Sequence, residues 1–536
     1  MKLIFISGGV ISGIGKGISA ASIGLLLEKH SLKVSFLKCD PYINIDAGTM
    51  NPVEHGEVFV TDDGYEMDMD AGHYERFMDI TISHKNSITT GQIYSQVIQN
   101  ERNLKYDGAC VEVIPHVRDE IIRRIKEAYK GSDLLIIEIG GTIGEYQNDI
   151  YYEAERYLKQ ILKDDLVHIH ISYLPIPSSI GEMKTKPTQQ SVILLNQRGI
   201  FPNIIIGRSQ EHIDTPRRKK IAIATNVSDE NIFSNMDVSS IYKVPIQFYD
   251  QKLDLKILEL LNIKGKKINF EDWENFVSKI ESKPKSILNI GIVSKYHNSG
   301  KFSLEDSYVS VIESIKIACW ESGVGFNIIW VDSENIDEKE LEKCDSFIVP
   351  GGFGTRGIEG KIKAIQYARE NKKPYLGLCL GMQLAAVEFA RNVCGIKDAT
   401  SEEIDIKSKN KIIHIMPDQE KKLLNKDYGA SMRLGLWECV LDKKSRAYKA
   451  YKKDVIKERH RHRYEFNNDY KEIFESKGML FSGRSPEGEL VEIMELKEHP
   501  FFIGVQFHPE FKTRPLIPHP LFLEFILSTI KNNGTI

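Results

Sequence analysis

The sequence predicts an α/β protein built from two doubly wound domains. In both halves, short apolar or β-branched runs precede segments whose apolar residues recur at helical spacing. Continuous apolar runs are typical of buried parallel strands, and their alternation with helices gives βαβ units. A chain of 536 residues is also too long for one hydrophobic core. We expect ligands at the carboxyl ends of the strands, where such sheets bind them.

Strands and helices alternate along the first half, and a polar stretch separates it from the second. The predicted strands of the first half cover residues 3–7, 33–38, 133–141, 167–172 and 203–209. Its clearest helices are predicted over residues 18–30 and 118–130. Because residues 264–286 become polar and lysine-rich, we predict domains of residues 1–265 and 287–536, joined by a linker of residues 266–286. Strands of the second domain are predicted in SILNIGIVS, FNIIWVD, DSFIVPGG, YLGLCLG and FFIGVQFHPE.

Composition and charge narrow the class of protein. The chain is 41% hydrophobic and 27% charged, which is typical of globular proteins and argues against a disordered or fibrous one. The net charge of −4 gives no reason to expect binding to nucleic acid or to a membrane. Seven cysteines without a CxxC pair indicate neither a disulfide framework nor a zinc site, so a reducing, cytoplasmic location is expected.

The amino terminus could be mistaken for a secretory signal. Five glycines and Lys16 interrupt its apolar stretch within residues 1–22, so it fits a strand, a glycine loop and a helix start better. A run of about 18 apolar residues, as a membrane span requires, does not occur in the sequence.

Cys379 is the candidate nucleophile of the second half. It follows an apolar run, and Gly377 and Gly381 permit the sharp strand-to-helix turn that exposes a nucleophile. His508 follows another apolar run and could serve as its base, with Glu510 placed to orient the imidazole. The alternative interpretation is that Cys379 is a core cysteine and His508 an unrelated surface histidine. The two glycines that flank Cys379, Gly377 and Gly381, argue against it. The other six cysteines are interpreted as ordinary cysteines.

Pro350, Gly351 and Gly352 also follow a predicted strand, where glycine N–H groups could face an oxyanion. Together with GLCLGMQ and FHPE, this segment resembles the class I glutamine amidotransferases over residues 287–536. The resemblance implies that Cys379 attacks the carboxamide of glutamine, that His508 transfers the proton and that amides near Gly351 and Gly352 stabilise the oxyanion. It also implies glutamine contacts at Leu380, Gly381, Met382, Gln383, Glu403 and Arg463.

Residues 458–464 interleave cationic and aromatic side chains, as nucleic-acid sites do. The run is too short for such a patch, and a solvated charged face is the simpler interpretation. A guanidinium can also bind a carboxylate with two hydrogen bonds. The resemblance favours Arg463 for this role towards the α-carboxylate of glutamine.

A glycine loop at residues 8–17 follows the first strand and opens a helix, a setting in which N–H groups and a lysine hold phosphates. It departs from the P-loop pattern, because Val10 replaces the first glycine and Gly17 replaces the Ser or Thr that reaches Mg²⁺. Asp70 and Glu138 are the candidate Mg²⁺ ligands. An ordinary glycine turn is the alternative interpretation.

Further lysines, among them Lys38, Lys184 and Lys186, lie near glycine, proline or a strand end, which suggests two polyphosphate ligands. The segments SGGVISGIGKG, LKCDPYINIDAGTMNPVEHGEVFVTDDG, DAGHYERF, EIGGTIG and GEMKTKPTQ resemble the CTP synthase family, over the whole chain. The resemblance implies a dethiobiotin-synthetase-like synthase domain in which ATP phosphorylates the uracil 4-oxygen of UTP. Ammonia from the other domain then displaces phosphate to give CTP, through a passage closed to water.

The same resemblance implies residue roles in the first half. Lys16 and Lys38 are expected to be catalytic, the latter near the transferred phosphoryl group. ATP contacts are expected from Gly13, Ile14, Gly15, Lys16, Gly17, Ile18, Asp70, Asp237 and Val238. Contacts to UTP, or to CTP as product inhibitor, are expected from Ser12, Glu145, Tyr146, Gln147, Lys184, Thr185, Lys186, Pro187, Thr188, Gln189 and Lys220.

Regulation and assembly are implied as well. GTP is expected as an activator that orders a lid within residues 353–360, which includes Phe353, Gly354, Thr355, Arg356 and Gly357. The ammonia path is expected to pass His55 and Val58. A homotetramer is expected, with filaments as a further state. Met236 departs from the family pattern at the adenine site, and Tyr146 and Gln147 depart from it in the CTP-inhibition segment.

Two alternative functions remain. Another ATP-dependent amidase, such as one acting on corrinoid acids, shares the domain types, but KTKPTQ and DPYINIDAGTM argue against it. A filament-forming structural protein is the second alternative, against which the intact Cys379, His508, Glu510 and Lys16 argue.

Overall fold

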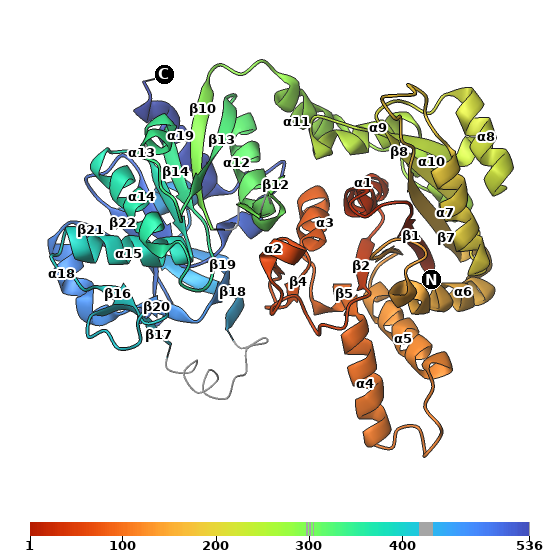
Figure 1. Ribbon diagram of the computed structural model, residues 1–536, viewed down its shortest axis with the longest axis horizontal. Coiled ribbons are helices and arrows are strands. Elements are labelled where there is room, and N and C mark those ends of the chain that lie inside the picture. Colours follow the sequence, from red (N-terminus) through yellow and green to blue (C-terminus); the bar gives the residue numbers. More distant parts are fainter. Residues whose placement is uncertain (296–297, 300–301, 304, 417–431, 535–536) are drawn as a thin grey trace. The chain divides into compact units, whose positions relative to one another are not determined.

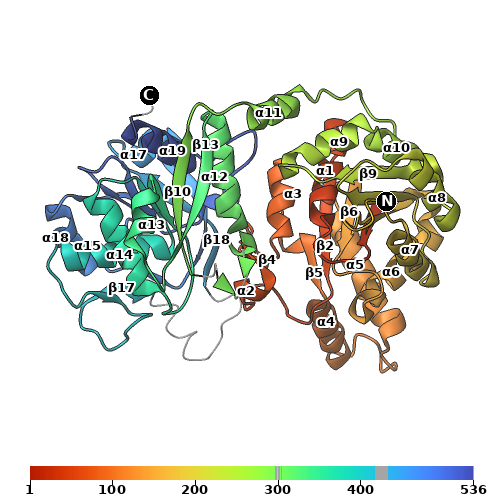
Figure 2. The same cartoon turned by 45° about the horizontal axis from the view of Figure 1, so that its top comes forward.

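The computed structural model describes residues 1–295, 298–299, 302–303, 305–416 and 432–534. The chain forms two compact units (Figures 1 and 2). The first unit comprises residues 1–46 and 73–277, and the second comprises residues 47–72 and 278–536. Most of the chain thus divides close to the expected linker, but residues 47–72 group with the second unit although they come from the sequence of the first half.

The first unit is built on a seven-stranded sheet in the order β5-β2-β6-β1-β7-β8-β9, and every pair of neighbouring strands is parallel. This confirms the predicted parallel sheet, whose strands β1, β2, β6, β7 and β8 overlap the predicted ones. The strands β5 and β9 at its two edges were not predicted. In chain order the strands are β1 (Lys2–Gly8), β2 (Val34–Asp40), β5 (Ser87–Thr89), β6 (Leu134–Ile139), β7 (Leu166–Tyr173), β8 (Ile204–Ser209) and β9 (Ile232–Met236).

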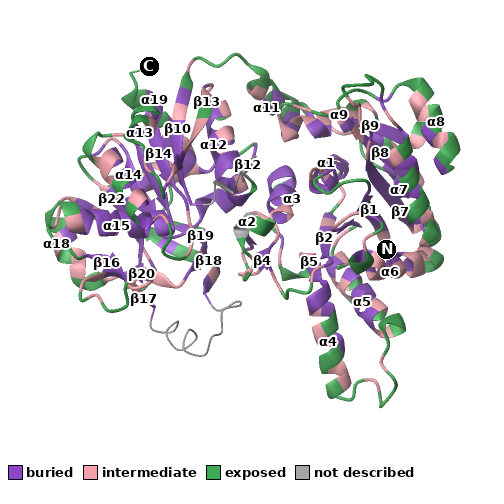
Figure 3. Cartoon of the chain, in the orientation of Figure 1, coloured by how far each residue is buried: buried purple, intermediate pink, exposed green. Residues whose placement is uncertain are grey.

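The helices of the first unit cover both faces of this sheet, and its strands are buried (Figure 3). One core joins alternate residues of the central strands, such as Phe5, Leu37 and Ile137, to the helices α5 and α6. The glycine loop leads into α1, as predicted. The helices are α1 (Lys16–Lys29), α3 (Asp70–Met78), α4 (Thr90–Arg102), α5 (Arg118–Tyr129), α6 (Asp149–Leu162), α7 (Lys186–Gln197), α8 (Thr215–Thr225), α9 (Val244–Asp250), α10 (Leu253–Leu260) and α11 (Glu271–Glu281).

The second unit is built on a nine-stranded sheet in the order β13-β10-β14-β15-β23-β22-β21-β18-β19. It is parallel from β13 to β23 and antiparallel beyond, so only its first part follows the doubly wound pattern. The parallel strands are β10 (Ile287–Ser294), β13 (Gly325–Asp332), β14 (Ser346–Val349), β15 (Tyr375–Leu378) and β23 (Phe502–Val505). The antiparallel ones are β18 (Arg433–Leu441), β19 (Val455–His462), β21 (Met479–Arg484) and β22 (Val491–Leu496).

Two cores lie on opposite faces of this sheet, because strand residues alternate between them. Phe347 and Tyr375 pack with one group of helices, whereas Ile348 and Leu376 pack with the other. A small sheet joins β16 (Thr400–Ser401), β17 (Lys411–Ile415) and β20 (Tyr464–Phe466). The helices are α12 (Val309–Glu321), α13 (Glu338–Lys343), α14 (Ile358–Glu370), α15 (Leu380–Asn392), α17 (Arg446–Tyr451), α18 (Lys471–Ser476) and α19 (Pro520–Asn532).

Residues 47–72 belong to the second unit through specific polar contacts. They contain α2 (Pro52–His55) and a hairpin of β3 (Phe59–Val60) and β4 (Glu66–Met67). Two arginines of β19 pair with carboxylates of this segment, Arg459 with Asp62 at 2.5 Å and Arg461 with Glu66 at 2.7 Å. These ion pairs hold the segment against β19 of the second unit.

Glu57 anchors the same segment to α12. Its buried carboxylate accepts hydrogen bonds from the Ser310 amide at 3.1 Å and from the Ser310 hydroxyl. Ser310 lies in the first turn of α12, where N–H groups lack partners within the helix and a negative charge is favourable.

Among the described residues, the structure contains no helix with the length and apolar character that crossing a membrane requires.

We expect Glu57→Ala to destabilise the second unit by about 2 kcal/mol, because it leaves the amide and hydroxyl of Ser310 without their buried acceptor. The midpoint of thermal unfolding should fall by roughly 4–8 °C for a unit of this size, as measured by calorimetry. Glu54→Ala, which removes an exposed carboxylate of the same segment, is the control. Equal midpoints for the two variants would contradict the anchoring role.

Two candidate active sites

Cys379 lies at a sharp turn between β15 and α15, as predicted. Its φ of 50° is in the left-handed region, a strained conformation for a residue with a side chain. The flanking glycines leave room for this turn, since a Cβ on Gly381 would lie 2.1 Å from the Val349 carbonyl oxygen. The Tyr375 hydroxyl donates a hydrogen bond to the Gly381 carbonyl at 2.9 Å and fixes the first helical turn.

His508 and Glu510 follow β23, which pairs directly with β15. The His508 Nδ1 lies 2.7 Å from the Glu510 carboxylate, which leaves Nε2 as the nitrogen available for proton transfer. Burial by itself would lower the pKa of His508, but the charges of the Glu510 carboxylate and of a Cys379 thiolate raise this pKa to about 10. The charges of Glu510 and of a Cys379 thiolate therefore favour the protonated imidazole, which can give its proton to a group that departs beside the sulfur.

The three side chains line one cavity of about 70 Å³ within the second unit. Gly351 and Gly352, which follow β14, line it too. Because β14, β15 and β23 are neighbours in the sheet, their carboxyl ends deliver the predicted oxyanion loop, nucleophile and base to one place. Leu380, Gly381 and Met382 form the start of α15 and are buried.

Gln506 is a residue of this site that the sequence analysis did not single out. Its amide nitrogen lies 3.7 Å from the Cys379 sulfur, and its amide oxygen accepts from Gln383 at 3.3 Å. Gln383 also donates to the Tyr464 carbonyl at 2.9 Å. The sequence could have identified it, because Gln506 precedes His508 by two positions and residues two apart in an extended segment lie on the same side.

The charged run at residues 458–464 is neither a nucleic-acid patch nor a solvated face. Most of it forms the antiparallel strand β19, so its side chains alternate in direction. Arg461 lines the cavity of Cys379 and stacks on the ring of Phe353 at 4.9 Å. His460 and His462 are buried, and burial lowers the pKa of each well below its usual value. Arg463 follows β19 and is partly buried.

The predicted lid segment is held by several polar contacts. Lys295 donates to the carbonyls of Phe353 and Gly354, the latter at 2.8 Å. The Gly354 amide donates to Glu403 at 2.8 Å, so a predicted glutamine contact is joined to the lid. Arg356 donates to the Lys295 carbonyl at 2.5 Å, while Thr355 and Gly357 complete the turn before α14.

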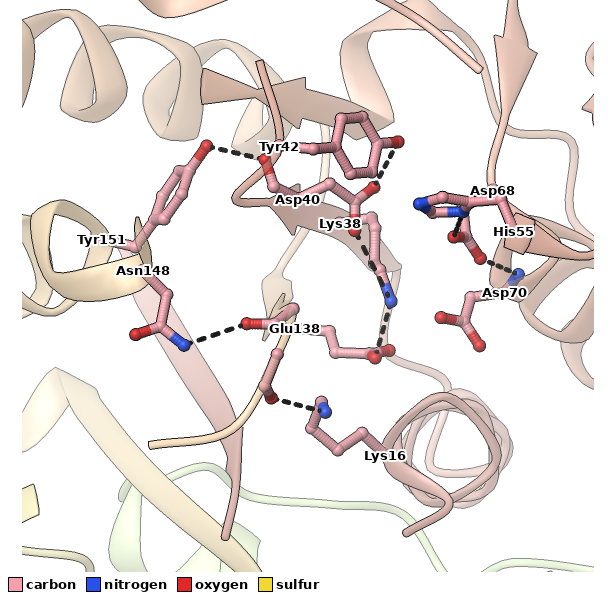
Figure 4. Close-up of polar contacts among 12 residues, drawn as sticks. Lys16, Lys38, Asp40, Tyr42, His55, Asp68, Asp70, Glu138, Asn148 and Tyr151 are labelled. Carbon is pink, nitrogen blue, oxygen red and sulfur yellow. Dashed lines mark hydrogen bonds and ion pairs between the residues drawn. The ribbon is translucent and has the colours of Figure 1, made fainter. Parts of the chain in front are cut away.

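The glycine loop of the first unit joins β1 to α1, and Lys16 is the first residue of that helix. The Lys16 amine donates to the Gly141 carbonyl at 2.8 Å, beside the end of β6 (Figure 4). Val10 has a φ of 78°, the left-handed conformation for which the P-loop pattern has glycine. Thus the loop keeps the glycine conformation despite its unusual residue. Between these positions lie Ser12, Gly13, Ile14, Gly15, Gly17 and Ile18.

Lys38 and Glu138 lie at the ends of the neighbouring strands β2 and β6 and form a buried ion pair at 2.9 Å (Figure 4). Tyr74 also donates a hydrogen bond to Glu138. Asp40, two positions after Lys38 on the same strand, places a second buried carboxylate 3.9 Å from the lysine amine. Asp40 and Tyr74 were not predicted as site residues, although Asp40 shares the side of its strand with Lys38.

The carboxylates Asp40 and Glu138 have the oxygen donors that Mg²⁺ prefers, and Mg²⁺ is commonly held by one or two carboxylates together with substrate phosphates. Among the described residues, no three or more His, Cys, Asp or Glu side chains group in a way that could hold a metal. The donor set therefore fits a metal bound jointly with phosphates. Asp70 begins α3 in the stretch assigned to the second unit, so its approach to Glu138 stays a prediction.

The predicted pyrimidine-nucleotide residues lie on four segments of the first unit, one of which is the glycine loop with Ser12. Lys186 begins α7, whose first turn also holds Pro187, and the Thr188 hydroxyl accepts from Ser172 at 3.0 Å. Lys184 is partly exposed and pairs with Glu182 at 2.7 Å. The remaining residues are Thr185 and Gln189 at α7, Lys220 on the exposed side of α8, and the segment of Glu145, Tyr146 and Gln147.

Two of these residues have distinct surroundings. Burial opposes ionisation of Glu145, but hydrogen bonds from Thr142 lower the pKa of its carboxyl. Tyr146 is 94% exposed. At the adenine positions, Asp237 and Val238 directly follow β9, and Asp237 pairs with Arg208 at 2.9 Å.

Two family models match the chain. The model described as CTP synthase N-terminus matches residues 2–263, and the one described as glutamine amidotransferase class-I matches residues 303–528. A CTP synthase from Desulfovibrio desulfuricans is 47% identical over 541 residues, with 98% of each chain covered. A CTP synthase from Hydrogenobaculum sp. is 49% identical over 526 residues, covering 98% of this chain and 97% of that one.

Among solved structures, a glutaminase domain of a Trypanosoma brucei CTPS with bound acivicin is 37% identical. The match covers 46% of this chain and 94% of that chain, with a TM-score of 0.42.

We expect Gly351→Ala to disturb His508, because a Cβ at this position would lie 2.7 Å from the His508 ring carbon Cε1. Alkylation of Cys379 by iodoacetamide at neutral pH should slow by roughly tenfold or more once its base is displaced. Peptide mass spectrometry identifies the alkylated cysteine, and the exposed Cys110 serves as the internal control. An unchanged rate at Cys379, relative to Cys110, would contradict this geometry.

Proposed function

The chain belongs to the CTP synthase family, and from that premise we propose how its two units divide the reaction. The protein is an ATP-dependent ligase that converts UTP to CTP with nitrogen from glutamine. The observation that carries the division of labour is the placement of Cys379, His508 and Glu510 at the ends of adjacent strands in the second unit.

We propose that the second unit hydrolyses glutamine. The Cys379 sulfur forms a bond to the carboxamide carbon, and the electrons of the C=O double bond move to the oxygen. His508, which holds the proton taken from the thiol, gives it to the nitrogen; the C=O bond then re-forms as the C–N bond breaks, and ammonia leaves. Water cleaves the resulting thioester to glutamate and frees the Cys379 sulfur. Glu510 keeps the imidazole oriented. We propose that glutamine contacts Gln383, Glu403 and Arg463. It also contacts the first residues of α15, which are Leu380, Gly381 and Met382.

In the proposed synthase reaction, the first unit transfers the γ-phosphoryl group of ATP to the uracil 4-oxygen. That oxygen is a poor leaving group until it is phosphorylated. Ammonia then bonds to C4, and phosphate leaves with the C4–O bond electrons. Lys16 and Lys38 hold the phosphates in this proposal, since Lys16 begins the helix that follows the glycine loop and Lys38 lies near the end of strand β2 (Figure 4). Asp40 and Tyr74 position Lys38 and Glu138.

A bound Mg²⁺ would neutralise phosphate charge in this step, held by Glu138 with Asp70 as the further predicted ligand and Asp40 as a second buried carboxylate. The loop from Gly13 to Ile18, with Asp237 and Val238, is proposed to hold ATP, and Ser12 beside it is proposed to contact UTP or CTP. Residues of α7 and α8, with the segment at Glu145, are proposed to hold UTP and inhibitory CTP.

Regulation and assembly also belong to the proposal. GTP is proposed to act on the lid at residues 353–357, which Lys295 and Glu403 join to the glutamine site. Val58 lines the cavity of Cys379 and, with His55, is proposed to lie on the ammonia path. A homotetramer that can extend into filaments is proposed, as is a cytoplasmic location, with which seven free cysteines are compatible.

We expect Cys379→Ala to abolish CTP formation with glutamine, by roughly a thousandfold or more, and to leave formation with an ammonium salt unchanged. The absorbance change from UTP to CTP measures both. Cys110→Ala, at an exposed cysteine, is the matched control. Loss of the ammonium-dependent reaction in a folded Cys379→Ala variant would contradict the division between the units.

Lys16→Ala should abolish CTP formation with either nitrogen source, because the phosphoryl transfer that both reactions share loses its phosphate contact. Glutamate release from glutamine, measured separately, should persist. Lys33→Ala, at an exposed lysine of the same unit, provides the comparison. Full ammonium-dependent activity in Lys16→Ala would remove Lys16 from the synthase site.

A further inference from the structure

Lys361 is a fully buried lysine of α14 for which the proposed reaction gives no role. Its side chain has no exposed surface, and its amine lies 3.5 Å from the carbonyl oxygen of Pro350. Among the described residues, no carboxylate forms an ion pair with this amine. Burying an amine without a charged partner is costly, so an apolar side chain would fill this position at lower cost.

The surroundings of Lys361 explain how the amine is tolerated there. Burial, followed by the positive charge of Lys295, lowers the pKa of Lys361 to about 7, while negative charge at Cys379 opposes the shift. An amine donates a hydrogen bond whether or not it is protonated. Lys361 can therefore hold the Pro350 carbonyl in both protonation states.

The Pro350 carbonyl belongs to the same peptide unit as the Gly351 N–H. In a trans peptide the C=O and N–H bonds point in opposite directions, so holding the carbonyl on one side directs the N–H to the other. Gly351 lines the cavity of Cys379 and His508. No hydrogen bond engages the N–H of Gly351 or of Gly352 within the described parts of the chain. These N–H groups thus remain available to a ligand in the cavity.

We propose that Lys361 is a positioning residue of the glutaminase site, which holds the Pro350 carbonyl so that the Gly351 N–H faces the oxyanion formed at Cys379. This inference rests on the proposed hydrolysis of glutamine in the second unit. When the sulfur bonds to the carboxamide carbon, negative charge develops on the oxygen, and an N–H fixed in advance stabilises it. A hydrogen bond to the carbonyl also polarises the peptide and strengthens its N–H as a donor.

The first test compares Lys361→Met with Lys363→Met, which replaces an exposed lysine on the same helix. Methionine keeps the length of the apolar stem and removes the donor. For Lys361→Met, the kcat of glutamine hydrolysis should fall roughly 10- to 100-fold, while KM for glutamine stays within about threefold. CTP formation from an ammonium salt should stay at the value of Lys363→Met, and the midpoint of thermal unfolding should not fall below that of Lys363→Met.

A second test probes the oxyanion directly. The aldehyde analogue of glutamine adds the Cys379 sulfur to its carbonyl carbon, and the resulting tetrahedral adduct places its oxygen where the oxyanion forms. If Lys361 acts through this site, the inhibition constant of the aldehyde should rise by the same factor by which kcat/KM falls. Lys361→Gln retains an N–H donor and should lose less activity than Lys361→Met. If Lys361→Met fails to fold, Lys361→Gln takes its place in both tests, with Lys363→Gln as the control.

Unchanged kcat in folded Lys361→Met would overturn the inference. So would a loss confined to KM, a fall in kcat without a change in aldehyde inhibition, or equal losses in the Met and Gln variants. If the unsubstituted enzyme forms CTP from ammonium but releases no glutamate from glutamine, the proposed hydrolysis itself fails, and the role of Lys361 fails with it.

Discussion

Both candidate sites depend on one constraint, which is that neighbouring parallel strands end at the same edge of a sheet. In the first unit, β1, β6 and β2 bring the glycine loop, Glu138 and Lys38 together. In the second, β14, β15 and β23 do the same for the oxyanion loop, Cys379 and His508. Each functional residue sits at a strand end or in the turn that follows it, so the buried strands fix its position more firmly than a long loop would.

The second site also depends on a segment that lies far from it in sequence. Residues 47–72 are followed and preceded by parts of the first unit, yet they are held by carboxylate contacts to β19 and α12. Glu57 and Val58 thereby line the cavity of Cys379. Residues 47–72 lie in the first half of the sequence but belong to the second unit. The geometry of the cavity at Cys379 therefore depends in part on residues from the first half of the chain.

What the sequence could predict depends on how local the signal is. The glycine frame around Cys379, the loop before Lys16 and the apolar runs of the central strands are local, and the structure places them as expected. The edge strands β5 and β9 carry weaker patterns and were missed. The run at residues 458–464 was interpreted from its cationic and aromatic residues alone. Its alternation in β19, with Arg461 and His460 on opposite sides, depends on pairing with β18, and Arg461 is held by an ion pair with the distant Glu66. Gln506, Tyr74 and Lys361 act through contacts between distant segments, which spacing does not reveal.

The central claim is that the nitrogen released at Cys379 is the one that replaces the 4-oxygen of UTP, without first mixing with the surrounding water. The most direct measurement supplies glutamine labelled with ¹⁵N at its amide together with an excess of unlabelled ammonium, and determines the label in CTP by mass spectrometry. The account predicts label well above the fraction of ¹⁵N in the free ammonium pool. Label equal to that fraction would contradict transfer within the protein.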